Sequence, residues 1–248
     1  MGQVVKISKL GNDIVQIKME DRDSKNTFST ALVEGISNSF KEIKKDPDAK
    51  VVILTGYDNY FCCGGTKKEL LAIYNKEITF AVLKFFVEPL MCDLPVISAM
   101  QGHGIGGGFV FGCYADFMIL GKENIYTTNF MKYGFTPGMG GTYMVPQKLG
   151  SVIGNEMLYT AENYRGIELL ERGIPQKVVP KSEVMAEAFK LARQLAEKPR
   201  ISLITLKKQL TIEAKSKIDQ IIGDELAMHD ATFHRPEVAE RIEKLFNG

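Results

Sequence analysis

One glycine-rich stretch decides the interpretation of this chain: Gln101-Gly102-His103-Gly104-Ile105-Gly106-Gly107-Gly108-Phe109-Val110-Phe111-Gly112 (QGHGIGGGFVFG). Half of its twelve residues are glycine, and it follows an apolar run over residues 95–100. Glycines between a strand and a helix allow a backbone to approach a ligand closely. The residues that come after them, Phe109–Phe111, carry no group that can move a proton. The stretch therefore indicates a backbone binding site without an obvious general base beside it.

The hydrophobic pattern on both sides of this stretch predicts strands that alternate with helices. A strand-like pattern occupies residues 4–7, 14–19, 50–56, 95–100, 116–120, 125–128 and 176–179. Apolar residues recur with a helical period over 28–43, and Ser29 or Thr30 is the expected N-cap of that helix. Residues 57–61 and 102–108 are predicted as loops. The chain is therefore expected to have an α/β core.

The same pattern divides the chain into two predicted parts. Residues 1–195 contain the strands and are expected to form the core, whereas residues 196–248 are helical and charged. Neither a linker nor a low-complexity segment separates the two. The sequence thus predicts an α/β core followed by a helical C-terminal region.

Composition excludes several classes of function. The 248 residues carry a net charge of +1, which gives no basic excess for nucleic-acid binding. No apolar window is long enough to span a membrane, and the N-terminus lacks the apolar core of a signal peptide. The four cysteines show no metal-ligand spacing, so no metal site is expected. We expect a cytoplasmic protein with reduced thiols.

Two glycine pairs stand at matching strand-to-helix junctions, Gly64-Gly65 and Gly106-Gly107. Two backbone N–H groups that face one point form an oxyanion hole, which stabilises negative charge developing on a carbonyl oxygen. The alternative is that the glycines only permit tight packing of helix on strand. The repetition at two equivalent junctions favours the oxyanion hole.

Two other kinds of chemistry fit the sequence less well. Gly102, Gly104 and Gly107 match the G-x-G-x-x-G pattern of dinucleotide sites, and Glu123 could be forced into the role of the ribose-binding acid. The helix that follows is too short for that fold. A thiol nucleophile at Cys62 or Cys63 lacks the histidine and acid pattern that would activate it.

The whole chain resembles the crotonase (enoyl-CoA hydratase/isomerase) superfamily. The resemblance rests on five segments in the right order: VVILTG at 51–56, FCCGG at 61–65, PVISAMQGHGIGGG at 95–108, Ala115-Asp116, and GFTPGMGGT at 134–142. It implies a ββα spiral core with a helical C-terminal region, and assembly as a homotrimer or a dimer of trimers. It also implies that the backbone N–H groups of Gly65 and Gly107 hold a thioester carbonyl.

The departures from the superfamily pattern point to a different reaction. Hydratases of this superfamily use two glutamates, and the matching positions here are Val110 and Phe130. Neither side chain can activate or protonate water, and both are expected to make the substrate pocket drier. Decarboxylation still profits from an oxyanion hole in a dry pocket, because loss of CO₂ produces an enolate.

One branch of the superfamily matches in more detail, the decarboxylating enoyl-hydratase homologues of polyketide β-branching cassettes. The similar segments are YDNYF at 57–61, MQGHGIGGG at 100–108, NFMKYGFTPG at 129–138 and ELAMH at 225–229, followed by Thr232-Phe233. The resemblance implies conversion of a 3-methylglutaconyl group to 3-methylcrotonyl on the acyl carrier protein of a polyketide synthase. On its helix pattern alone, His229 would be a buried core histidine. The resemblance instead makes it the expected acid that protonates the dienolate, or at least a residue that orients the substrate carboxylate.

The branch also uses a lysine to hold the substrate carboxylate. Lys76 is the expected residue, but it fits only if its segment is shifted, and Lys84 is the other candidate. Tyr74 is expected to assist in the pocket. No metal or redox cofactor is expected, since the phosphopantetheine arm arrives with the carrier protein. The alternatives are a CoA-thioester isomerase or decarboxylase of primary metabolism, and a non-catalytic crotonase-fold scaffold that binds an acyl carrier.

Overall fold

The computed structural model describes residues 3–11, 13–78 and 84–247. Two β-sheets form its centre. The larger has six strands in the order β1-β2-β3-β5-β7-β10, and the smaller has four in the order β4-β6-β8-β9. The strands of the larger sheet are β1 (Val5–Lys9), β2 (Ile14–Met19), β3 (Val51–Thr55), β5 (Val96–Met100), β7 (Phe117–Gly121) and β10 (Lys177–Val179). Those of the smaller are β4 (Tyr60–Cys62), β6 (His103–Ile105), β8 (Ile125–Thr127) and β9 (Tyr164–Arg165).

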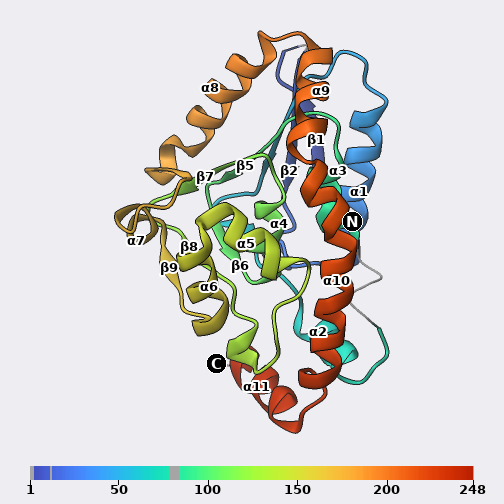
Figure 1. The fold of residues 1–248 in the computed structure, drawn as a ribbon, viewed down its shortest axis with the longest axis vertical. Helices are drawn as coiled ribbons and strands as arrows, with labels where there is room; N and C mark the ends of the chain where they lie inside the picture. Colours follow the sequence, from blue (N-terminus) through green and yellow to red (C-terminus); the bar gives the residue numbers. More distant parts are fainter. Residues whose placement is uncertain (1–2, 12, 79–83, 248) are drawn as a thin grey trace.

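Helices surround the two sheets (Figure 1). The first group is α1 (Thr30–Lys44), α2 (Lys67–Tyr74), α3 (Glu88–Met91), α4 (Gly107–Cys113), α5 (Gly141–Leu149), α6 (Ser151–Thr160) and α7 (Gly166–Glu171). The second is α8 (Val184–Ala196), α9 (Arg200–Leu210), α10 (Ile212–Thr232) and α11 (Pro236–Asn247). Short 3-10 turns are η2 (Lys84–Val87), η3 (Met131–Tyr133) and η4 (Lys181–Glu183).

The chain winds as a repeated strand–strand–helix unit. Successive turns are β3-β4-α2, β5-β6-α4 and β7-β8-α5, and each turn adds one parallel strand to each sheet. This arrangement is the predicted ββα spiral, so the predicted fold class is confirmed. Each turn leaves its glycine junction on the same side of the spiral, which is why glycines far apart in sequence meet.

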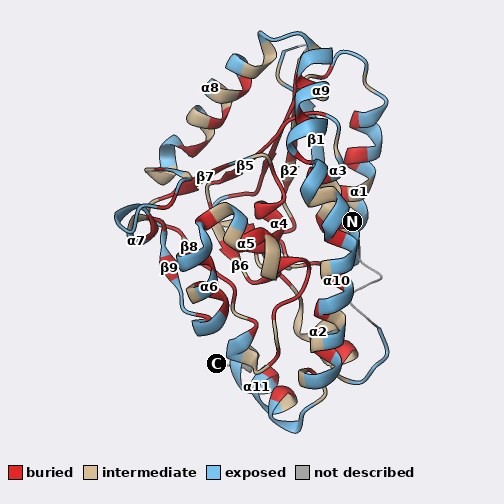
Figure 2. Cartoon of the chain, viewed as in Figure 1, coloured by how far each residue is buried: buried red, intermediate tan, exposed pale blue. Residues whose placement is uncertain are grey.

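Two apolar clusters hold the spiral together. The larger lies between the sheets and the helices, and Figure 2 shows it as the buried centre of the molecule. The smaller lies under α8, where Val184, Ala188 and Ala192 pack on strand residues that include Ile53 and Ile97. Strands β3 and β5 are buried along their whole length, as expected for parallel strands covered on both faces.

The short strands of the smaller sheet correct the sequence prediction. Residues 57–61 and 102–108 were expected to be loops, but β4 and β6 lie within or across them. Each has three residues, which is too short to show an alternating pattern. Their pairing comes from the spiral, since β6 lies between β4 and β8 and bonds to both.

The last two helices pack against earlier helices of the chain. Helix α10 packs on α5, and α11 contacts α2 and η3. Lys67 in α2 forms an ion pair of 2.7 Å with Glu243 in α11. Arg241 Nη1 donates to the carbonyl oxygen of Lys132 at 3.3 Å. Within the described residues, none of the helices has the length and apolar character that crossing a bilayer would require.

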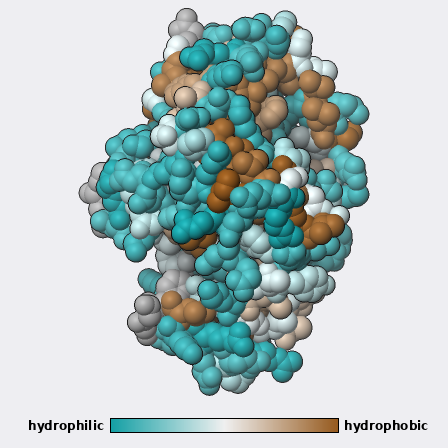
Figure 3. All heavy atoms as spheres, turned by 90° about the vertical axis from the view of Figure 1, so that its left-hand side faces the viewer, coloured by the Kyte–Doolittle hydropathy of each residue, from teal (hydrophilic) through white to brown (hydrophobic). Residues whose placement is uncertain are grey.

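Apolar side chains also reach the surface. Figure 3 shows the face that carries α6, α7 and α8, where hydrophobic atoms gather in a patch near its middle. Val152 and Tyr159 in α6 are 75% and 79% exposed. A second exposed group follows α9 and the start of α10: Ile201, Leu206, Leu210 and Ile212. Large exposed apolar areas of this kind are characteristic of surfaces that bind other proteins.

Candidate active site

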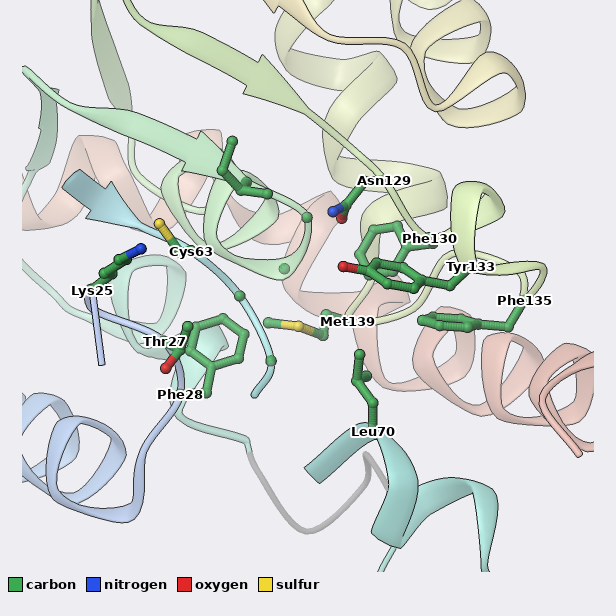
Figure 4. Close-up of a pocket in the computed structure, with 15 residues that line it drawn as sticks. Lys25, Thr27, Phe28, Cys63, Leu70, Asn129, Phe130, Tyr133, Phe135 and Met139 are labelled. Atoms are coloured by element: carbon green, nitrogen blue, oxygen red, sulfur yellow. The ribbon is translucent and has the colours of Figure 1, made fainter. Parts of the chain in front are cut away.

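A cavity of about 260 Å³ opens beside the first turn of α4 (Figure 4). Four stretches of the chain, residues 25–28, 63–70, 105–107 and 129–139, supply its wall, which joins the glycine junctions to an aromatic group. The lining residues are Lys25, Thr27, Phe28, Cys63, Gly64, Gly65, Leu70, Ile105, Gly106, Gly107, Asn129, Phe130, Tyr133, Phe135 and Met139. Both predicted oxyanion residues are among them.

Gly65 and Gly107 meet in this wall because the two junctions approach each other closely. A Cβ on Gly64 would lie 2.9 Å from the carbonyl oxygen of Ile105 and 3.2 Å from the nitrogen of Gly107. Gly64 and Gly106 also have positive φ angles of 74° and 55°. Only glycine satisfies both conditions without strain. The glycines therefore serve close packing of the junctions as well as access to the cavity.

The two backbone N–H groups suit a carbonyl oxygen. In the part of the chain that the structure describes, neither the N–H of Gly65 nor that of Gly107 donates a hydrogen bond to the protein. Both residues line one cavity, where a bound carbonyl oxygen can accept from both. Donors fixed in advance toward a developing oxyanion lower the barrier of enolate-forming reactions.

The opposite wall of the cavity is aromatic. Phe130, which replaces a superfamily glutamate, lines it together with Phe135 and Tyr133. The rings of Tyr133 and Phe135 stack at 5.9 Å with an interplanar angle of 17°. Met139 and Leu70 complete this side. Phe130 thus contributes apolar surface where water chemistry would need a carboxylate.

Two residues that were expected in the pocket lie outside its wall. Val110 is buried in α4, and its Cγ2 faces α5, 3.2 Å from the position of a Cβ on Gly141. Tyr74 is half-buried at the end of α2, where its carbonyl oxygen accepts from His234 Nδ1 at 2.9 Å. Val110 therefore acts in the packing of α4 on α5, and Tyr74 in the attachment of α2 to the C-terminal helices.

His229 lies directly behind the cavity wall. Its Nε2–H donates to the carbonyl oxygen of Thr136 at 2.9 Å, and its ring meets Phe135 edge to face at 6.1 Å. A Cβ on Gly138 would lie 2.5 Å from the ring. Burial lowers the pKa of His229, against the raising effect of the Thr136 and Pro137 backbone. The imidazole is therefore neutral at pH 7. It lies against Gly138, the residue before Met139 of the cavity wall.

The predicted carboxylate-binding lysines are not in this wall. Lys76 is exposed after the end of α2, with a φ of 62°, and Lys84 forms an exposed ion pair of 3.0 Å with Asp219. The segment between them falls outside the described residues. The role predicted for Lys76 has no support in this geometry. Lys25 lines the cavity instead, with an exposed side chain.

The remaining candidates have structural explanations. Burial raises the pKa of the Cys63 thiol to about 11, which disfavours the thiolate that a nucleophile needs. His103 Nδ1 accepts from the backbone N–H of Ile125 at 2.9 Å and so joins two strands. Neither residue carries the chemistry of this cavity.

Four polar residues of the wall were not singled out from the sequence: Lys25, Thr27, Asn129 and Tyr133. Asn129 and Tyr133 lie in the NFMKYGFTPG segment, on both sides of Phe130. The signal was therefore available, because a residue three positions from a pocket residue lies on the same side of a tight turn. Lys25 precedes a stretch without a recognisable motif.

Comparison with known proteins identifies the family to which the chain belongs. Residues 9–245 match the enoyl-CoA hydratase/isomerase family. The chain belongs to this family, the crotonase superfamily. The bacillaene synthase decarboxylase PksI of Bacillus subtilis (strain 168) is 49% identical to this crotonase over 245 residues, which cover 99% of the chain and 98% of PksI.

Solved structures agree with this assignment. One belongs to a dehydratase/decarboxylase enzyme couple involved in polyketide β-branching; its TM-score is 0.97 at 49% identity, over 99% of this crotonase and 100% of that chain. The ECH2 decarboxylase domain of CurF from Lyngbya majuscula has a TM-score of 0.95 at 45% identity, over 98% and 99%. The predicted resemblance to the superfamily and to its decarboxylating branch is confirmed.

Proposed function

We propose that this crotonase is a thioester decarboxylase of polyketide β-branching, which converts a 3-methylglutaconyl group on an acyl carrier protein to 3-methylcrotonyl. The observation that carries the proposal is the full-length similarity to proteins named as decarboxylases, at 49% and 45% identity. The cavity supports it, because among the described residues its wall holds no carboxylate. A hydratase would need such a group to activate water.

The lining of the cavity suits the proposed acyl group. Phe130 and Phe135 are buried apolar side chains of its wall, and a branched acyl chain can pack against them.

The glycine side and the aromatic side of the cavity have different roles in the proposed reaction. With the thioester carbonyl between Gly65 and Gly107, the bond to the carboxylate carbon breaks and CO₂ leaves. Its electron pair passes through the conjugated system to the thioester oxygen, where the two N–H groups stabilise it. The dry aromatic side disfavours the localised charge of the carboxylate. The dienolate then takes up a proton. His229 stays the predicted acid for this step, but its neutral ring donates Nε2–H to Thr136, so it must first take up a proton at Nδ1.

The decisive experiment is an intact-mass assay on a carrier protein loaded with 3-methylglutaconyl. Loss of the mass of CO₂ supports the proposal. Gain of one water would instead indicate a hydratase, and no change over many enzyme equivalents would indicate a non-catalytic acyl-carrier binder. The same assay on the CoA thioester separates carrier-protein from CoA specificity. We expect the rate to be unaffected by EDTA, since no resident metal or redox cofactor is proposed.

We further propose that the chain works as a homotrimer or a dimer of trimers in the cytoplasm. The exposed apolar side chains of α9 and the start of α10 support a self-contact, and we propose that the helical C-terminal region at 196–248, to which they belong, is the trimerisation region. Sedimentation should report a trimer or hexamer. The double variant Leu206→Asp, Ile212→Asp should shift the protein toward the monomer. The four free cysteines suit a reducing compartment.

A further inference from the structure

A second, smaller cavity of about 20 Å³ lies next to the candidate active site, on the side of α2. Its lining shares four residues with the larger cavity: Phe28, Gly65, Leu70 and Met139. The other lining residues are Glu69, Ile73, Ile78, Phe85 and Phe86. The four shared residues therefore form a partition between the two cavities.

The smaller cavity is an apolar space. Among the residues that the structure describes, Glu69 is the one polar side chain in its lining, and its carboxylate belongs to the N-terminal cap of α2. There Oε2 accepts from the backbone N–H of Thr66 at 2.9 Å and from the Thr66 hydroxyl at 3.0 Å. A cavity of this size and lining suits an apolar group better than a water molecule, which needs several polar partners.

Met139 stands at the centre of the partition. A Cβ on Gly107 would lie 2.6 Å from Met139 Sδ and 2.7 Å from Phe28 Cε2, so the ends of both side chains meet over the predicted oxyanion residue. Figure 4 shows the Met139 side chain between Phe28 and the aromatic side of the larger cavity, with Leu70 on the side of α2. An acyl chain that starts from a carbonyl bound at Gly107 therefore meets the Met139 side chain.

Two buried contacts hold the backbone at Met139 in an unusual conformation. Its φ of 62° lies in the left-handed region, which residues with a side chain rarely adopt. Its carbonyl oxygen accepts from the Tyr114 hydroxyl at 2.7 Å, and the next N–H, that of Gly140, donates to Glu225 at 2.6 Å. Strained backbone of this kind persists where its surroundings fix it, and it is concentrated at ligand sites. The peptide bond after Met139 is thus held on both sides, and this keeps the side chain in the partition.

We propose that Met139 determines which acyl groups this crotonase accepts. Its side chain closes the larger cavity toward α2, so an acyl chain too long for that cavity has no access to the apolar space behind it. Methionine suits this place because it is unbranched and fills irregular gaps between apolar side chains. The inference rests on the proposed function for the acyl group that reacts, and it adds a specificity-determining residue to that site.

Met139→Ala tests the partition, because it removes the side chain beyond Cβ and joins the two cavities. Three unreactive pantetheine thioesters of increasing length serve as probes: 3-methylbutyryl, 3-methylpentanoyl and 3-methylhexanoyl. Calorimetry measures their binding. We expect Met139→Ala to bind 3-methylhexanoyl on the order of tenfold more tightly than the unmodified protein does, as for two further CH₂ groups taken out of water. Binding of 3-methylbutyryl should gain nothing, because that acyl group is too short to enter the smaller cavity.

Met144→Ala is the matched control, since Met144 is a buried methionine of α5 that lines neither cavity. It should keep the chain-length preference of the unmodified protein. Ile73 lines the smaller cavity but not the larger one, so adding Ile73→Phe to Met139→Ala should remove the gain. Met139→Gly removes the same side chain and relieves the left-handed strain, so it should show the gain even if Met139→Ala folds poorly.

An unchanged chain-length preference in both Met139 variants would overturn the inference. So would an equal gain in Met144→Ala, which would show a general loosening, or a gain that survives Ile73→Phe, which would place the longer chain elsewhere. Because the probes do not react, these results are independent of the decarboxylation assay. A protein that fails that assay but gains 3-methylhexanoyl binding in Met139→Ala would refute the proposed function and keep the role of Met139.

Discussion

Gly65 and Gly107 have a hydrogen atom in place of a side chain, and the space around each position determines whether a larger residue would fit. A Cβ on Gly65 would be 3.4 Å from Leu70, an ordinary contact. A Cβ on Gly107 would be 2.6 Å from Met139 Sδ and 2.7 Å from Phe28 Cε2, both of which line the cavity. The two positions therefore differ in what they tolerate, although both are predicted to serve the same oxyanion.

This difference predicts unequal effects of alanine at the two positions. Gly107→Ala should lower kcat/KM for decarboxylation about 100- to 1,000-fold, the effect of losing one oxyanion donor, because the first turn of α4 must shift. Gly65→Ala should lose less, since its methyl group fits. Initial rates measure the effect, and circular dichroism checks that both variants fold. Equal losses would show that the packing around Gly107 is not what holds its N–H in place.

His229 predicts a pH dependence of stability. Burial lowers its pKa below the usual 6.5, so the unfolded chain binds a proton more readily than the folded one. The free energy of unfolding should then fall as pH drops below about 6.5, by up to about 1.4 kcal/mol per pH unit. His229→Gln removes this contribution. Urea unfolding between pH 7 and pH 5 should give a flatter profile for the variant, and an unchanged slope would contradict the sign of the shift.

The residues that could be predicted from the sequence are those whose motif dictates backbone geometry. Gly65, Gly107 and Phe130 belong to strings with fixed spacing, and the structure brings all three to one cavity. Lys76 depended on a segment without such a string, and it lies on the surface. Tyr133 lies in such a string as well, three positions after Phe130 at the end of η3, so its place in the wall could have been predicted.

At the scale of elements, a buried carboxylate connects α10 to α5. Glu225 accepts from the N–H of Gly140 at 2.6 Å, from the N–H of Thr142 at 2.9 Å and from the Thr142 hydroxyl at 2.6 Å. Burial raises its pKa, and these three donors oppose the rise. The contact fixes the turn at 138–142, which contains the wall residue Met139.

Replacing this carboxylate should weaken the connection. Glu225→Gln turns one acceptor atom into a donor that faces donors, and should lower the free energy of unfolding by about 1–3 kcal/mol. Asp224→Asn on the exposed side of the same helix is the control and should change it by less than about 0.5 kcal/mol. Urea unfolding measures both. If Glu225→Gln is as stable as Asp224→Asn, the turn at 138–142 does not depend on the Glu225 carboxylate.

Length explains which elements the sequence could predict. The long strands β2, β3 and β5 and the helix α1 have enough residues to show a period, and the structure has them within two residues of the predicted bounds. Strands β4 and β6 have three residues each, too few to show a period. Their pairing depends on neighbouring turns of the spiral, which no local pattern encodes.

At the scale of the whole molecule, a C-terminal helix packs against two elements that line the cavity, although it lies far from them in the sequence. Helix α11 packs on α2 and η3, and Val238 and Ile242 are fully buried there. The predicted division between residues 195 and 196 falls at the last residue of α8, before α9 begins, and stays a prediction. The cavity wall, however, depends on contacts from both sides of that boundary.

This dependence predicts an effect at a distance. Ile242→Ala should lower the free energy of unfolding by about 2–5 kcal/mol, the range for a buried isoleucine. It should also weaken binding of an unreactive 3-methylbutyryl pantetheine thioester, because η3 loosens. Leu245→Ala on the same helix, where the side chain is 38% exposed, is the matched control. Urea unfolding and calorimetry measure the two effects. Intact probe binding in a destabilised Ile242→Ala would show that α11 supports the fold without shaping the cavity.

The attachment of α11 to α2 also has a consequence for biosynthesis. Domains fold as they leave the ribosome, N-terminal parts first. The glycine junctions, α2 and η3 emerge well before α11, yet Lys67 must wait for Glu243 to complete their contact. A nascent chain therefore presents an unfinished binding wall until α11 has been translated and released. Acyl carriers would meet a competent binding site only after that step.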